Sequence, residues 1–316
     1  MKRRRRKRYR SESSPNKKAV GVFIIALLFT LILAVVIGLA IGKALGDAAK
    51  KLDRESYDNE IFSYEASSTV PINAALLNLE GHTNDSILNK VDTLQNVSAV
   101  SVYLRGNSGT LLYKSNVFEG VHGNFGGIID LPALVDKLHK KDIYVSAVCY
   151  VKSPSVKDEL AFESTAEFES SLLLEIINSG VDDIVITGLE TDTSSIAAAS
   201  RLFAKVREKA DKTVILGAAL GYTAMLSESG AYCAEKYSSF ADLIAVDMAS
   251  CKSEGYSFAS LAQRLSVIFE QYPVRALIDC ANDTDRTAAV NELNALGIYN
   301  IQAYRSSDYS GPSAVG

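Results

Sequence analysis

The sequence of 316 residues has no tryptophan, three histidines, four cysteines and only one long apolar run. His82, His122 and His139 share no metal-ligand spacing, and the cysteines are too dispersed for a zinc site, so no metal is predicted. A single apolar run excludes a multi-span transporter. The chain also lacks the G-x-S-x-G elbow of serine hydrolases, and no cysteine lies beside a histidine as a thiol nucleophile requires.

Acidic side chains are nearly absent from residues 1–42, where Glu12 is the single acid against ten Lys and Arg. Of the 33 basic and 37 acidic side chains in the chain, residues 43–316 hold 23 and 36, a net charge of −13. Because phosphate binding needs a positive surface, no nucleic-acid partner is expected for this acidic part. The basic tail indicates an orientation signal beside a membrane.

The one long apolar run, residues 19–42, reads AVGVFIIALLFTLILAVVIGLAIG and carries no charge. As a helix it would span about 36 Å, enough for a hydrocarbon core of about 30 Å. The preceding basic residues 1–18 then lie in the cytoplasm and residues 43–316 outside the cell. A cleaved signal peptide is the alternative, but its apolar region is usually about 7–15 residues long and no clear A-x-A site follows. We expect a single-pass, signal-anchored protein of the cell membrane that contacts the bilayer through residues 19–42.

The chain beyond this anchor divides into a polar stretch and a folded domain. Residues 43–70 have no apolar face long enough to bury and predict a juxtamembrane stalk. Residues 71–316 alternate short apolar runs, typical of strands buried on both faces, with amphipathic helical stretches. The predicted strands are 72–79, 97–104, 143–151, 183–189, 213–220, 242–248, 274–280 and 298–304. The predicted helices are 86–94, 131–141, 166–180, 195–210, 231–239, 258–272 and 286–297.

Eight strands alternating with seven helices predict an α/β fold, the (β/α)8 TIM barrel, preceded by a single N-terminal transmembrane helix. Asp, Ser or Thr precede several of the helices as N-caps, and Gly180 and Gly297 fall at C-caps. A doubly wound sheet is the alternative, but it usually carries a Gly-rich phosphate loop, and neither G-x-G-x-x-G nor a P-loop occurs. No cofactor is predicted. The eighth helix is expected to be missing or replaced by the stalk.

A barrel places its active site at the C-terminal ends of the strands, where this sequence has tyrosines and carboxylates. The candidate catalytic residues are Glu190, Asp247 and Asp279, and the candidate substrate-binding residues are Tyr103, Arg105, Tyr150, Thr187 and Tyr304. Asp247 and Asp279 end neighbouring strands and form a carboxylate pair, or they bond backbone amides or Arg275 at the barrel top. Arg105 either clamps an anionic group of the substrate or is a surface charge.

Several stretches resemble the glycoside-hydrolase-like domain of bacterial cell-envelope proteins, a relative of the chitinase-type barrels. VSAVSVYLRGNSGTLLYKSNV (97–117) is similar to the second strand of that family and its continuation, and KKDIYVSAVCYVKSP (140–154) to its passage into strand three. GVDDIVITGLE (180–190), ADLIAVDM (241–248) and YPVRALIDC (272–280) resemble strands four, six and seven. The resemblance implies a barrel that acts on or binds cell-envelope polysaccharide or peptidoglycan.

The predicted fourth strand departs from this family at the catalytic positions. Chitinase-type enzymes end the strand with D-x-x-D-x-D-x-E, in which alternate residues face the barrel mouth. Alignment on Asp182 puts Val185 and Thr187 at inward positions and leaves no acid there, whereas alignment on Asp183 leaves only Glu190. The first alignment keeps the G-x-D pattern of the family and is preferred. The tryptophan common at sugar-stacking floors is also absent, although the 15 tyrosines could replace it.

The sequence therefore supports two functions. The first is a membrane-anchored glycoside hydrolase with Glu190, or the pair Asp247 and Asp279, as acid and base. The second is a catalytically inactive barrel that serves as a glycan- or protein-binding or structural module, and the missing acids tilt the balance slightly toward it. Glu190 is otherwise a loop carboxylate that caps the helix at 193–210.

The four cysteines permit three disulfide connectivities if the domain is exported. Cys251 and Cys280 follow adjacent predicted strands and could pair. Cys149 lies inside a predicted strand and is expected to be a small core residue.

Overall fold

The computed structural model describes residue 43 and residues 70–94, 97–106, 108–117, 125–152, 159–211, 213–280 and 282–305. The predicted tail at 1–18, the predicted transmembrane helix at 19–42 and nearly all of the predicted stalk lie outside these residues. Within the described part of the chain, no helix has both the length and the apolar character needed to cross a membrane.

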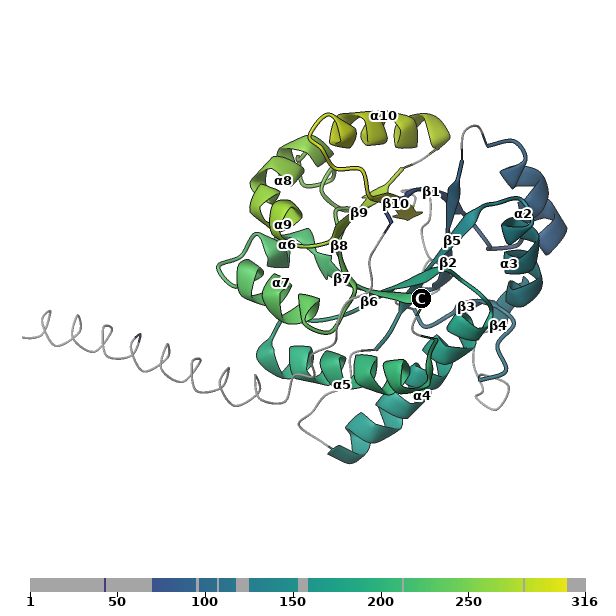
Figure 1. Cartoon of the computed structure of the whole chain (residues 1–316), viewed down its shortest axis with the longest axis horizontal. Coiled ribbons are helices and arrows are strands. Elements are labelled where there is room, and N and C mark those ends of the chain that lie inside the picture. Colours follow the sequence, from purple (N-terminus) through teal and green to yellow (C-terminus); the bar gives the residue numbers. More distant parts are fainter. Residues whose placement is uncertain are drawn as a thin grey trace, which may run out of the picture. The chain divides into compact units, whose positions relative to one another are not determined.

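In the described chain, eight parallel strands close into a barrel that is surrounded by helices (Figure 1). Each strand pairs with the next barrel strand in the sequence, and pairing of β1 with both β2 and β10 closes the sheet. The strands are β1 (Asn73–Leu77), β2 (Ala99–Arg105), β5 (Tyr144–Tyr150), β6 (Asp183–Thr187), β7 (Ile215–Gly221), β8 (Leu243–Asp247), β9 (Val274–Asp279) and β10 (Ile301–Arg305). All eight coincide with predicted strands, so the predicted α/β barrel is confirmed.

The helices of the described chain overlap the predicted stretches, with three differences, one of which is that the helix predicted at 166–180 begins at Glu159. The helices are α2 (Asn84–Val91), α3 (Leu131–His139), α4 (Glu159–Asn178), α5 (Thr193–Lys209), α6 (Tyr222–Met225), α7 (Gly230–Ser238), α8 (Phe258–Arg264), α9 (Ser266–Gln271) and α10 (Asp283–Asn294). The predicted helix 258–272 is broken at Leu265 into α8 and α9, and the single turn α6 was not predicted. Gly180 and Gly297 follow α4 and α10 with positive φ, as C-cap glycines do.

Two short strands outside the predicted set extend the sheet from β2. β3 (Leu111–Tyr113) pairs antiparallel with β2, and β4 (Phe125–Ile129) pairs with β3. Glu175 of α4 holds β3 and the residues that follow it. Its carboxylate accepts hydrogen bonds from the Tyr113 hydroxyl (2.9 Å) and from the backbone amide of Asn116 (2.5 Å). Burial, together with this carboxylate, raises the pKa of Tyr113.

Side chains of the barrel strands alternate between two apolar layers, as the two-residue repeat of a strand requires. Outward residues such as Ile184 and Ile186 of β6 pack with the helices in the main core. Inward residues form a separate cluster inside the barrel that contains no helical residue, and its members are Val148, Val185, Ile215, Ala219, Leu243, Ala245 and Leu277. This cluster separates the two ends of the barrel interior.

A polar network around the fully buried Arg275 fills the N-terminal end of the interior. Its Nη2 lies 2.8 Å from Asp183 Oδ2, and both side chains are inaccessible to solvent. Its Nε donates to Asn300 Oδ1 (2.9 Å), and its Nη1 donates to Gln302 Oε1 (3.0 Å) and Ser146 Oγ (3.1 Å). Arg275 therefore contacts groups from β5, β6 and β10, and it binds together strands that lie on opposite sides of the barrel.

The Asp183 carboxylate has neutral partners as well as Arg275. It accepts hydrogen bonds from the Tyr144 hydroxyl (2.8 Å) and the Ser146 hydroxyl. Burial, with the neighbouring Asp183 carboxylate, raises the pKa of Tyr144. The suggestion that Arg275 bonds Asp247 or Asp279 at the C-terminal end of the barrel is wrong. Arg275 is the second residue of β9, so it lies at the N-terminal end, where it pairs with Asp183.

Candidate functional site

Five of the predicted site residues lie at or near the C-terminal ends of barrel strands, and we call this end of the barrel its mouth. Asp247 continues the inward series of Leu243 and Ala245 on β8, and Asp279 continues that of Leu277 on β9. Tyr150 and Thr187 continue the inward positions of β5 and β6 in the same way, and Tyr103 of β2 packs against the inner cluster. The two-residue repeat therefore brings one carboxylate pair, two tyrosines and a threonine to one rim.

Asp247 and Asp279 form the acidic side of this mouth. Asp247 is the last residue of β8 and pairs in register with Leu277, so Asp279 lies two residues further along the neighbouring strand β9. With strands about 4.8 Å apart and a rise of about 3.3 Å per residue, this register places the two Cα atoms roughly 8 Å apart. Both side chains are half-buried. Asp247 Oδ1 accepts the Ala249 amide (3.0 Å), which holds one face of that carboxylate in a tight turn.

Tyr150 and Gly188 form the opposite side of the mouth. Gly188 has a φ of +85°, and a Cβ at this position would lie 2.4 Å from the Val151 carbonyl oxygen and 2.5 Å from the Tyr150 ring. The Val151 amide also donates to the Thr187 carbonyl (2.9 Å). The glycine thus lets the Tyr150 ring rest directly on the backbone at the end of β6. Sequence reasoning did not single out Gly188, although a glycine directly after a strand is the usual signal of such a close approach.

Arg105 does not face the mouth, although it follows Tyr103 by two residues on β2. The register against β5 shifts between these residues, with Tyr103 opposite Val148 and Arg105 opposite Cys149. This bulge turns Arg105 outward. Its Nη1 donates to Glu169 Oε2 of α4 (2.5 Å) and to the Tyr150 carbonyl (3.2 Å), and it is buried there. We therefore leave Arg105 out of the substrate site.

The buried pair has a consequence for Glu169. Burial raises the pKa of Glu169, against the opposing effect of the Arg105 charge and of the hydrogen bond from the Lys152 amide. The pair lies between β2 and α4 rather than at a solvent-open surface. Arg105 donates to the Tyr150 carbonyl, and Glu169 accepts from the Lys152 amide. The pair therefore connects the backbone at the end of β5 to α4 and supports the position of Tyr150.

Glu190 lies beyond the end of β6 and is exposed to solvent. Its Oε2 is 3.3 Å from Ser195 Oγ in the first turn of α5, and the N-cap of that helix is Asp192, which accepts the Ser195 amide (3.1 Å). On β6 itself, Val185 belongs to the inner cluster, as the alignment on Asp182 expects. Glu190 lies three residues after the end of β6 and does not share the alternation of its inward residues, Val185 and Thr187. The side chain of Tyr304 lies outside the described residues.

No group of three or more His, Cys, Asp or Glu side chains with a metal-binding arrangement occurs among the residues that the structure describes. The described side chains at the mouth include carboxylates, a hydroxyl and aromatic rings.

The four cysteines are all buried and carry free thiols, so the suggested disulfide between Cys251 and Cys280 is not present. Burial raises the pKa of Cys149 to about 12 and those of Cys251 and Cys280 to about 11. Only the thiolate reacts with a thiol reagent such as DTNB. We therefore expect that, at pH 8, less than about one thiol per folded molecule reacts. After unfolding, all four thiols should react. Fast reaction of two or more thiols in the folded protein would contradict this packing.

No family model and no curated protein matches the sequence. Solved structures with similar folds include an L-ribulose 3-epimerase (10% identity, TM-score 0.48, covering 75% of this chain and 82% of that one). They also include chitinases from Aspergillus fumigatus (14%, 0.46, 71% and 85%) and Bacteroides thetaiotaomicron (11%, 0.44, 72% and 77%). The barrel itself is established by the pairing of the eight strands.

Proposed function

We propose that the mouth of this barrel binds a glycan and hydrolyses it with Asp247 and Asp279 as the acid–base pair. The observation that supports this most directly is the position of the two carboxylates, which end neighbouring strands on the inward face. Glycoside hydrolysis uses two carboxyl groups about 5–9.5 Å apart, and aspartate side chains on Cα atoms roughly 8 Å apart can reach that separation. One carboxyl group would protonate the glycosidic oxygen as that bond breaks. The other would activate a water molecule that attacks the sugar, or would itself attack and form a glycosyl–enzyme bond that water then hydrolyses.

The opposite side of the mouth suits a sugar. Tyr150 and Tyr103 offer aromatic faces on which the apolar face of a sugar ring can stack, and the Thr187 hydroxyl can exchange hydrogen bonds with sugar hydroxyls. With the predicted membrane anchor and the resemblance to envelope barrels, we infer that the substrate is cell-envelope polysaccharide or peptidoglycan outside the cell. The net charge of −13 on residues 43–316 disfavours strongly anionic polymers as substrates.

A second candidate is a barrel that binds glycan or a protein without cleaving it. This proposal is supported by β6, where Val185 and Thr187 occupy inward positions at which chitinase-type strands carry acids. Such a barrel would keep the aromatic side of the mouth and use the carboxylates only as hydrogen-bond acceptors.

The two candidates are separated by assaying release of reducing ends from purified envelope glycan with the full chain in detergent micelles. For the hydrolase, Asp247→Asn and Asp279→Asn should each lower the rate by about 100-fold or more, since general acid–base groups contribute about 10²–10⁴. Glu190→Gln is the matched control, because this exposed carboxylate lies outside the inward series, and it should change the rate by less than about twofold. Glycan binding without release by the wild type would instead support the binding module. Loss of activity in Glu190→Gln alone would contradict the proposed pair.

A further inference from the structure

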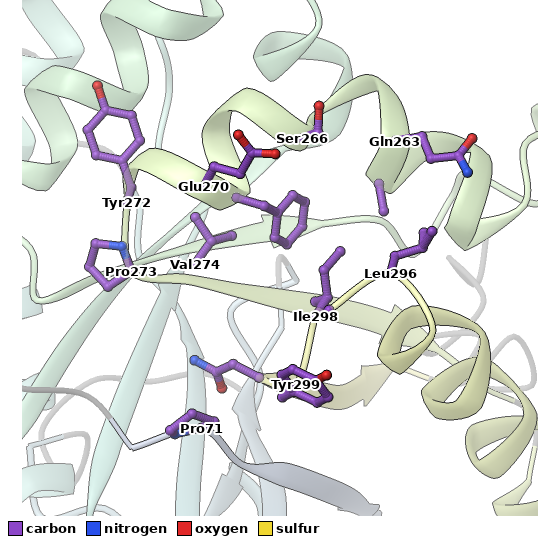
Figure 2. Close-up of a pocket in the computed structure, with 14 residues that line it drawn as sticks. Pro71, Gln263, Ser266, Glu270, Tyr272, Pro273, Val274, Leu296, Ile298 and Tyr299 are labelled. Atoms are coloured by element: carbon purple, nitrogen blue, oxygen red, sulfur yellow. The ribbon is translucent and has the colours of Figure 1, made fainter.

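A groove of about 430 Å³ with mainly apolar walls lies at the end of the barrel opposite the mouth (Figure 2). It is bounded by α8, α9 and the segments that lead into β1, β9 and β10. We call it the basal groove, and its lining includes Pro71, Phe269, Tyr272, Pro273, Ile298 and Tyr299. Figure 2 places Pro71 and Tyr299 on one side of the space and Glu270 and Tyr272 on the other.

The basal groove coincides with exposed apolar surface. Tyr299 is 62% exposed, Leu296 38% and Val70 64%. These are three of the five large apolar side chains that are exposed among the described residues, and Val267, a fourth, lies on α9 next to the lining residue Ser266. Single exposed apolar residues are ordinary, but a cluster of them around an apolar hollow indicates a surface that a partner covers.

The N-terminal part of the chain enters the fold at this groove, since Pro71 lines it and Val70 precedes it directly. Residues 61–64 read IFSY, the densest cluster of large apolar side chains between residues 43 and 69. They precede Pro71 by only seven to ten residues, a stretch that reaches at most about 23–33 Å when extended. A single reversal of the chain would therefore bring this cluster back over the groove.

We propose that residues 61–64 of the same chain dock in the basal groove, with Phe62 as the main apolar contact. A short covalent tether gives an effective concentration in the millimolar range, so even a weak intrinsic affinity would keep the groove filled. The net charge of −13 on residues 43–316 disfavours the competing occupants, an anionic lipid surface or a second copy of the chain.

Disulfide trapping in the full chain in lipid nanodiscs tests the contact. We pair Phe62→Cys with Gln263→Cys on the groove wall, and in the control variant Phe62→Cys with Glu228→Cys on the loop after β7, near the mouth end. Because the four native thiols are buried, mild oxidation acts on the introduced pair. The groove pair should form an intramolecular disulfide at least about tenfold faster than the control pair, since only a docked segment has a high local concentration there. Equal rates, or a dimer linked through the two introduced thiols of the groove pair, would overturn the proposal.

Hydrogen exchange provides the second measurement. Phe62→Ser changes a residue outside the described fold, so it should leave the barrel intact, and exchange in α2 serves as the internal reference. Amides of α9 and of residues 296–300 should exchange at least about fivefold faster in Phe62→Ser than in the wild type, because the docked segment shields them. Unchanged exchange would overturn the proposal, as would protection that requires anionic lipid and persists in Phe62→Ser.

Discussion

Arg275→Met should lower the free energy of unfolding by about 3–5 kcal/mol, the cost usually found when one partner of a buried ion pair is removed. The substitution leaves the Asp183 carboxylate fully buried, with only the hydroxyls of Tyr144 and Ser146 to satisfy it. It also removes the donors to Asn300 and Gln302, which join β9 to β10. Urea unfolding of the full chain in detergent micelles, followed by circular dichroism, measures the effect.

Two further variants make this prediction specific. Lys140→Met breaks the exposed pair of Lys140 and Asp136, whose side chains are 71% and 62% exposed, and should change stability by less than about 0.5 kcal/mol. Combining Arg275→Met with Asp183→Leu removes both buried charges, so the double variant should lose less stability than the two single losses added together. A loss in Arg275→Met no larger than that in Lys140→Met would show that the network is not needed for the fold.

Gly188→Ala should destabilise the protein by about 3 kcal/mol and weaken glycan binding at the mouth. The left-handed backbone costs an L-residue about 1–2 kcal/mol, and the overlap of the new methyl group with the Val151 carbonyl and the Tyr150 ring adds about 1–3 kcal/mol. Relief of this overlap must move either the end of β6 or Tyr150, and both belong to the mouth. Thermal unfolding and a glycan-binding titration measure the two effects.

Gly255→Ala is the matched control for this substitution. Gly255 has the same φ of +85°, but no atom lies within 4 Å of the position of its Cβ. It should therefore show only the backbone cost of about 1–2 kcal/mol and leave glycan binding unchanged. Equal losses in the two variants would mean that the contact of Gly188 with Tyr150 has no role in shaping the mouth.

Much of the fold could be predicted because its signals are local. Parallel strands covered on both faces must be apolar along nearly their whole length, and this makes runs such as DIVIT and LIAVD visible without any knowledge of their partners. Glycines with positive φ mark helix ends, as Gly180 and Gly297 do. Two strands escaped prediction. β3 has only three residues and is held by Glu175 of α4, about 60 residues away in the sequence, and among the described strands β4 pairs only with β3.

The candidate site was predictable to the extent that strand alternation holds. Asp247, Asp279 and Thr187 end strands whose inward residues repeat every second position, so the mouth residues on β6, β8 and β9 follow from the sequence pattern. The same alternation wrongly predicts that Arg105 points into the barrel. A bulge after Tyr103 shifts the register, so Arg105 points outward. No feature of the β2 sequence indicates that bulge, because it depends on the pairing with β5 and on the buried Glu169 of α4.

Local patterns in the sequence are enough to predict the eight barrel strands, the barrel that they form and the strand ends at which its mouth lies. The contacts between distant residues are visible only in the folded chain. Arg275 meets Asp183 at the N-terminal end of the barrel, Arg105 meets Glu169 between β2 and α4, and the Tyr150 ring lies against Gly188 at the mouth. The alternation of apolar residues along one strand shows which of them are buried, whatever their partners are. The pairing of buried polar groups depends instead on register and bulges between strands far apart in the chain.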